Sequence, residues 1–228
     1  NCTGNKVLTG NSCGGKYEKC IEPLQYLYSD RTLSAEIIPG KSVIGIAVDP
    51  ENRLAVAIDY IMTTGWGGYG IDIPTLENTP SSGAGIYVRG ERDSYLIRDG
   101  KANTAKILAY GRSNGISYPA AEAAYNYQPG SCSSSSWCGR GNWYLPSNWQ
   151  VFPYFDNRAT IHLMLKAINK MPDDWWYTRN DFYTVTSNEI NAKESGFIYI
   201  NTGGMAHGGK NLTEPDNLQT LVLPYITY

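Results

Sequence analysis

Two short β-branched runs separated by a strong turn signal constrain the fold of this chain more than any other feature. Residues 42–48 read Ser-Val-Ile-Gly-Ile-Ala-Val, and residues 53–58 read Arg-Leu-Ala-Val-Ala-Ile. The Asp-Pro-Glu-Asn segment between them, residues 49–52, has the composition of a turn. The sequence therefore predicts a hairpin of two buried strands.

Helical patterns lie in the middle of the chain. The segment Asp99–Thr104 leads into a short predicted helix over residues 105–110, which we expect to end at Gly111. A second helix is predicted over residues 119–127, because Pro119 suits the first helical position and four alanines follow.

The clearest helical pattern covers residues 158–170. Its apolar side chains recur at i, i+3, i+4 and i+7, and they are Ile161, Met164, Leu165 and Ile168. Asp156 or Asn157 can cap the start of this helix.

Three further runs, at residues 181–186, 196–200 and 219–223, have the composition of strands. Strands thus surround two or three central helices, and the sequence predicts an α+β fold with a largely antiparallel sheet.

Composition excludes several classes of protein. The chain has 228 residues, 42% of them hydrophobic and 18% charged, which is not the composition of a disordered protein. Its net charge of -2 argues against nucleic-acid binding, and its apolar runs are too short to span a membrane. With 18 Tyr, 6 Trp and only 2 His, the composition favours an extracellular binding surface over proton-transfer chemistry.

Five cysteines indicate an oxidising compartment. Cys132 and Cys138 flank a serine-rich segment, and we expect them to close a short loop as a disulfide; the alternative is two free thiols in a flexible loop. We expect a second disulfide between Cys13 and Cys20, and Cys2 then has no assigned partner in this sequence. The spacing and the two histidines do not suit a structural zinc site.

The N-terminal region reads as an arm that precedes one domain. Residues 1–22 are polar and rich in glycine and cysteine, and residues 23–228 form the expected single domain. The chain starts at Asn1 without Met, so we expect that a leader or an upstream region has been removed. Sequons at Asn1 and Asn211 agree with an exported protein, although so short a pattern also occurs by chance.

Several segments, in order, resemble one bacterial family. The strongest match is the segment Asn-Trp-Tyr-Leu-Pro-Ser at Asn142–Ser147. Four other segments match the family in the same order: the strand pair at 43–59, the Tyr-Pro-Ala-Ala segment at 118–121, the block Tyr183–Glu189, and Lys210 with the final strand. Together they are similar to the domain family typified by the C-terminal domain of the Legionella collagen-like adhesin, over roughly residues 40–228.

This resemblance implies a C-type-lectin-like fold, with small antiparallel sheets, two or three helices, long loops on one face and termini close together. The sequence departs from the family pattern at Thr184, where a tryptophan is usual, and at Leu223–Pro224, where an arginine is usual. These departures weaken the transfer of any specific ligand.

Long, aromatic-rich loops supply the candidate ligand-binding residues. Exposed Trp and Tyr rings stack on sugars and anchor protein interfaces. The candidates from the loops at residues 63–92 and 173–180 are Trp66, Tyr69, Trp175, Trp176, Tyr177, Arg179 and Asn180. The alternative for Trp175 and Trp176 is a local core beneath their loop, whereas Trp143 and Tyr144 are expected in the main core.

A calcium site is the one metal site that the sequence suggests. Glu214 and Asp216, in Glu-Pro-Asp-Asn, nearly match a calcium-binding loop motif of C-type lectins and offer oxygen ligands. A Pro-Asp turn that leads into a strand explains the same residues. The glycine-rich stretch at residues 203–209 lacks the order of a phosphate loop and is expected to be a mobile loop or the end of a hairpin.

Catalytic patterns do not emerge from the sequence. It has no Gly-x-Ser-x-Gly elbow, and the context of His162 and His207 links neither to a nucleophile. We therefore expect an extracellular, non-enzymatic binding or adhesion domain whose partner is a host or bacterial surface protein or glycan. One alternative is a pilus or surface-filament subunit that self-assembles; another is an enzyme of the sulfatase-modifying type, which would need a reactive cysteine pair.

Overall fold

The structure is a computed structural model, and it describes residues 23–79, 99–170, 183–199, 204–211 and 220–228. It also gives the backbone of β1 (Val7–Thr9), β2 (Lys19–Ile21) and β8 (Ile86–Tyr87). β1 and β2 pair with each other as an antiparallel two-stranded sheet, apart from the two larger sheets.

The predicted hairpin is confirmed at the centre of a five-stranded antiparallel sheet. β5 (Val43–Asp49) and β6 (Leu54–Ala57) pair through a turn in which Arg53 has a φ of 54°. The strand order is β13-β6-β5-β3-β4, with β3 (Gln25–Tyr28), β4 (Leu33–Ser34) and β13 (Tyr225–Thr227) not predicted. The first and last strands of residues 23–228 therefore share one sheet.

A second sheet has six strands in the order β7-β12-β9-β10-β11-β8. It contains β7 (Ile61–Thr63), β9 (Tyr183–Glu189), β10 (Glu194–Tyr199), β11 (Met205–Gly209) and β12 (Thr220–Val222). β12 runs parallel to β9, and the other pairs are antiparallel. The strands predicted near residues 181, 196 and 219 correspond to β9, β10 and β12.

Helices α1 (Gly100–Asn114) and α2 (Pro119–Asn126) follow one another in the chain. The Asp99 side chain caps α1 by accepting from the amide of Ala102, and Pro119 begins α2 as predicted. The prediction that the first helix ends at Gly111 is wrong. The helix continues to Asn114 and ends at Gly115, which has a φ of 66° and donates its amide to the Gly111 carbonyl oxygen. Glycine at 111 permits a close approach instead, since a Cβ there would come within 2.6 Å of the Ile116 carbonyl oxygen.

Helix α3 (Asn148–Asp156) was not predicted, because Pro153 inside it is a helix breaker. A capping box offsets this: the Ser147 side chain accepts from the amide of Gln150, and the Gln150 side chain accepts from the amide of Ser147. Helix α4 (Arg158–Ala167) begins at the predicted position. It ends before residue 170 because Asn169 adopts a φ of 57°.

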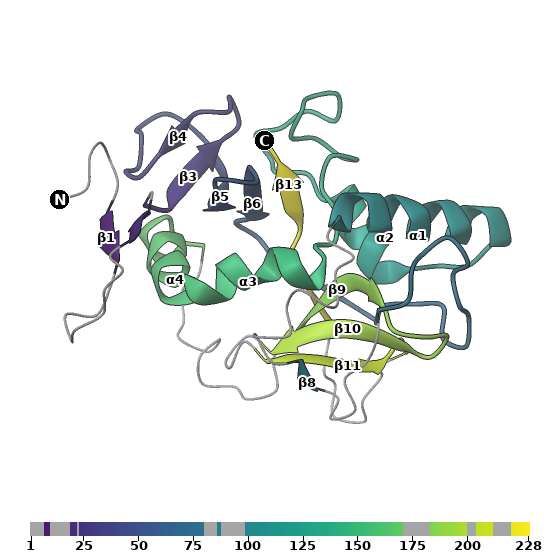
Figure 1. The fold of residues 1–228 in the computed structure, drawn as a ribbon. Helices are drawn as coiled ribbons and strands as arrows, with labels where there is room; N and C mark the ends of the chain where they lie inside the picture. Colours follow the sequence, from purple (N-terminus) through teal and green to yellow (C-terminus); the bar gives the residue numbers. More distant parts are fainter. Residues whose placement is uncertain are drawn as a thin grey trace, which may run out of the picture.

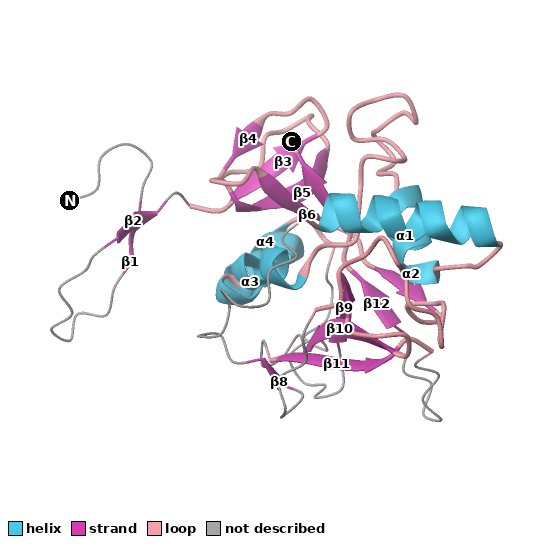
Figure 2. Ribbon diagram, turned by 45° about the vertical axis from the view of Figure 1, so that its right-hand side comes forward, coloured by secondary structure: helices cyan, strands magenta, loops and turns pink. Residues whose placement is uncertain are grey.

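The two large sheets enclose α3, which contacts β5 of one sheet and β9 and β10 of the other (Figure 1). Helices α1 and α2 lie beside the six-stranded sheet, against β9, β7 and β12 (Figure 2). The predicted α+β class with small, mainly antiparallel sheets is confirmed, although the described residues form four helices rather than two or three.

Strand β9 brings polar side chains into the interior. All seven of its residues are buried, and most of them are polar. Asn188 accepts from the amide of Asn148, which is the first residue of α3, and donates to the Thr79 hydroxyl at 2.8 Å. These contacts satisfy the buried side-chain amide of Asn188 and tie Thr79 to α3 and the sheet.

Candidate functional site

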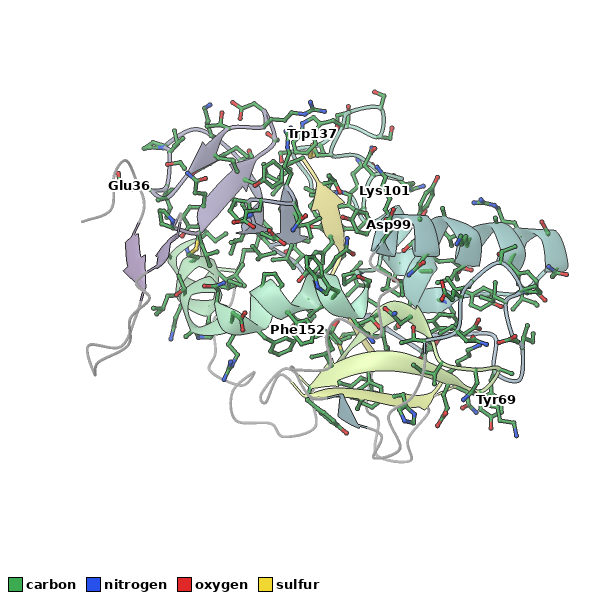
Figure 3. All side chains as sticks on the ribbon, in the orientation of Figure 1. Glu36, Tyr69, Asp99, Lys101, Trp137 and Phe152 are labelled. Atoms are coloured by element: carbon green, nitrogen blue, oxygen red, sulfur yellow. A yellow bond between two sulfur atoms is a disulfide. The ribbon has the colours of Figure 1, made fainter. Side chains whose placement is uncertain are left out.

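The long loop after β7 displays an exposed tyrosine. We define the Tyr69 loop as residues 65–79. Its first glycines, at 65, 67, 68 and 70, all have positive φ angles, which glycine adopts at little cost. Between them the Tyr69 side chain is 50% exposed, and it projects from the edge of the molecule (Figure 3).

A buried ion pair anchors this loop. The ammonium of Lys210, which follows β11, contacts the carboxylate of Glu189 at the end of β9, and both side chains are fully buried. Lys210 Nζ also donates to the carbonyl oxygen of Ile71 at 2.6 Å. The second carboxylate oxygen of Glu189 accepts from the amide of Ile73 at 3.1 Å. The pair thus bonds directly to two backbone groups of the Tyr69 loop.

Backbone hydrogen bonds complete the anchoring. The Lys210 carbonyl oxygen accepts from the amides of Trp66 and Gly67 at 3.1 and 3.0 Å. On the far side of Tyr69, the amide of Gly70 donates to the Ala192 carbonyl oxygen at 2.8 Å, and the amide of Thr79 donates to the Glu189 carbonyl oxygen at 2.7 Å. The loop is therefore held on both sides of its exposed tyrosine.

Trp66 is the base of the loop and is only 2% exposed. Its indole N–H donates to the Thr186 carbonyl oxygen at 2.8 Å, its ring meets Tyr118 edge-on, and Lys210 Nζ lies 4.9 Å from the ring centroid. This burial corrects the expectation that Trp66 contacts a ligand. Its aromatic face packs against the ammonium and stabilises the buried charge.

Burial dominates the electrostatics of the pair. Desolvation raises the pKa of Glu189 and lowers the pKa of Lys210, while their contact with each other opposes both shifts. Each charge is tolerable in the interior only because its partner and the loop backbone satisfy it. The integrity of the Tyr69 loop therefore depends on both residues.

The predicted disulfide between Cys132 and Cys138 is confirmed. The loop that it closes is held to the core because the Trp143 indole donates to the Cys138 carbonyl oxygen at 2.8 Å. Trp137, on the loop itself, donates to the Ser29 carbonyl oxygen at 2.8 Å. Neither thiol is free.

The core positions of Trp143 and Tyr144 are also confirmed, at 1% and 2% exposed. His162 in α4 is 9% exposed, so it is a buried residue of the helix.

The remaining predicted site residues lie outside the described residues. They are Trp175, Trp176, Tyr177, Arg179 and Asn180, the calcium candidates Glu214 and Asp216, and the side chains of Cys13 and Cys20. Within the described ranges, no three His, Cys, Asp or Glu side chains form a group that could hold a metal ion. None of the helices found there is long and apolar enough to cross a membrane.

The pairing of Glu189 with Lys210 was missed by sequence reasoning. One signal existed: Glu189 is the only charged residue of β9. Its partner could not be identified, because only the β9-β10-β11 order brings residues 189 and 210 together.

Comparison with known proteins gives one informative result. No protein-family model matches the chain, and no curated protein matches it. Among solved structures, the chain is similar to a fimbrial protein from Bacteroides ovatus ATCC 8483, with a TM-score of 0.55 and 14% sequence identity. The match covers 90% of this chain and 48% of that one, so this chain spans about half the length of the fimbrial protein. At this identity the likeness shows a shared fold.

Proposed function

We propose that this chain is a domain of an extracellular, fimbrial-type surface protein. The observation that carries the proposal is the structural likeness to the Bacteroides ovatus fimbrial protein, which extends over 90% of the chain. The bond between Cys132 and Cys138 supports an oxidising, extracellular location. The tyrosine-rich, histidine-poor composition also agrees with a surface role.

Immunogold electron microscopy of the producing cells tests this proposal. Antibody raised against residues 23–228 is expected to label filaments at the cell surface, and a deletion strain serves as the control. Boiling-resistant or shear-released high-mass species containing the chain would support assembly. Labelling confined to the cell interior, equal in both strains, would contradict it.

We further propose that the domain recognises a surface protein or glycan through the Tyr69 loop. A half-exposed tyrosine on a loop anchored on both sides supports this role, because a preorganised contact loses little conformational entropy on binding. Tyrosine also combines a large apolar face with a hydroxyl group, which suits it to binding interfaces. The resemblance to the Legionella adhesin domain family leads to the same proposal and stays a prediction.

A glycan and extracellular-matrix array, screened with and without calcium, tests the recognition role. Tyr69→Ala is expected to lower binding at least tenfold, about 1.4 kcal/mol, and to leave the melting temperature nearly unchanged. Tyr60→Ala is the matched control, since Tyr60 is also exposed, at 37%. Full binding by the Tyr69 variant would exclude this loop, and binding that requires calcium would support the site predicted at Glu214 and Asp216.

A further inference from the structure

A groove of about 490 Å³ lies at the turn between α1 and α2. Its buried lining includes Leu108 and Tyr118, whereas Arg112, Tyr125 and Asn126 line it from exposed positions. A concave apolar base with a few polar groups around it is the usual form of a small-ligand site, and the volume lies within the usual range.

The polar groups of the groove supply both donors and acceptors. Glu122 is held in place because its carboxylate accepts from the Ser117 hydroxyl at 3.1 Å and from the amide of Tyr118 at 2.9 Å. Arg112 lines the groove from an exposed position and forms no ion pair with any described residue, so its guanidinium is available as a hydrogen-bond donor. One cation and one anion leave the groove without net charge, which suits an uncharged ligand rich in hydroxyl groups.

An aromatic side chain is part of the groove lining. Tyr125 lines the groove and is 37% exposed. Such a ring offers its apolar face to the C–H groups of a pyranose while the neighbouring polar groups bond to the hydroxyls.

The groove adjoins the Tyr69 loop. A Cβ at Gly67 would lie 2.6 Å from the Ser117 carbonyl oxygen, and a Cβ at Gly68 would lie 2.5 Å from the Tyr118 ring. Tyr69 therefore follows directly on residues packed against one wall of the groove, and it lies on the same side of the molecule as the turn from α1 to α2 (Figures 1 and 3).

We infer that this groove binds a neutral hexose unit of a glycan chain. The inference rests on the recognition role proposed above and names its ligand class. Arg112 and Glu122 bond to the hexose hydroxyls, Asn126 donates and accepts beside them, and Tyr125 covers one face of the ring.

Nuclear magnetic resonance titration of the full ¹⁵N-labelled chain tests the site. The probes are four neutral disaccharides, lactose, maltose, cellobiose and mannobiose, each taken to millimolar concentration. At least one is expected to shift the amide signals of Gly111 and Gly115 and the side-chain Nε signal of Arg112. No shift with any of the four would overturn the inference, and so would shifts caused by glucuronic acid alone.

Two variants assign any binding to the groove. Arg112→Gln and Tyr125→Leu are each expected to raise the Kd at least tenfold. The matched controls Arg140→Gln and Tyr60→Leu change exposed residues outside the groove and are expected to leave the Kd unchanged. Binding that survives both groove variants, with unchanged melting temperatures, would overturn the inference.

The outcomes separate this inference from the proposals on which it rests. If the chain binds none of the sugars but antibody still labels filaments, only the inference about the groove is overturned. If the chain binds a sugar but antibody labels no filaments, the proposed fimbrial function is overturned and the inference about the groove is supported. Array binding that depends on Tyr69 but not on Arg112 confines recognition to the loop and overturns the groove.

Discussion

The side chain of Lys210 carries the anchoring of the Tyr69 loop, and its removal tests that role. Lys210→Met leaves the Glu189 carboxylate buried without its partner and removes the hydrogen bond to Ile71. Breaking one side of a buried ion pair costs about 3 to 5 kcal/mol. We expect a decrease of that size in the free energy of unfolding, measured by urea denaturation.

A surface control and a double variant test whether the effect of Lys210→Met comes from the buried ion pair. Lys41→Met breaks the ion pair with Asp30, whose side chains are 37% and 51% exposed, and it should leave the unfolding midpoint nearly unchanged. The double change Glu189→Leu with Lys210→Met removes both charges and should recover much of the lost stability. Equal effects of Lys210→Met and Lys41→Met would show that the buried pair does not anchor the loop.

Tyr144 makes the stability depend on alkaline pH. Its hydroxyl bonds to the Thr227 hydroxyl at 2.9 Å, and burial raises the pKa of Tyr144 to about 12. An unfolded tyrosine titrates near pH 10, so between about pH 10 and 12 the unfolded state loses a proton that the folded state keeps. The contribution of Tyr144 is therefore complete below pH 10 and is lost as the pH rises to 12.

The variant Tyr144→Phe removes this titration and keeps the ring. Its free energy of unfolding should fall less steeply between pH 10 and 12 than that of the parent protein, by up to about 1.4 kcal/mol per pH unit. Urea denaturation at pH 9, 10.5 and 11.5 measures the two slopes. Parallel slopes would show that Tyr144 ionises equally in the folded and unfolded states.

At the scale of elements, the glycines of the Tyr69 loop differ in how much space surrounds them. Gly67 has a φ of 101° and no room for a Cβ, because Ser117 and Tyr118 backbone atoms would lie within 2.7 Å of it. Gly70 has a φ of 85° and nothing within 4 Å. Gly70→Ala meets only backbone strain, about 1 kcal/mol, whereas Gly67→Ala must also displace the segment before α2.

We therefore expect Gly67→Ala to lower the melting temperature clearly more than Gly70→Ala. Differential scanning calorimetry of the two variants measures this difference. Both variants have the same alanine and a similarly unfavourable φ, so the comparison isolates the packing of the loop against residues 117 and 118. Equal melting temperatures of the two variants would show that the Tyr69 loop does not pack closely against residues 117 and 118.

Elements with local signals were predictable from the sequence, and elements that depend on distant partners were not. The β5–β6 hairpin and α2 have their own turn and proline signals, and both are confirmed. Glycine-rich β11 was predicted as a loop or hairpin end, and it is a strand because β10 and β8 pair with it on either side.

The same distinction applies to the candidate site. An aromatic, glycine-rich loop was identified from composition, but which ring it exposes depends on tertiary contacts. Trp66 is buried because Thr186 accepts its N–H and Lys210 lies near its ring, and both residues are more than a hundred positions away. Tyr69 is exposed because the loop is anchored on either side of it.

On the scale of the whole molecule, the chain crosses between the two large sheets twice. β6 belongs to the five-stranded sheet and β7 to the six-stranded one, with only residues 58–60 between them. The opposite crossing leads from β12 to β13, with only residues 223 and 224 between them. Helix α3 packs against both sheets, and one hydrophobic core combines side chains of both, such as Ile46 of β5 and Ile198 of β10.

Residues 23–228 should therefore unfold as one cooperative unit. The slowest backbone amides of β5 and β6 in one sheet, and of β9 and β10 in the other, should exchange with deuterium at the same free energy, equal to that of global unfolding. Hydrogen exchange followed by mass spectrometry, in rising but sub-denaturing urea, measures both sets in one experiment. Lower protection of one sheet, with little dependence on urea, would mean that it opens alone and that the crossings do not couple the two cores.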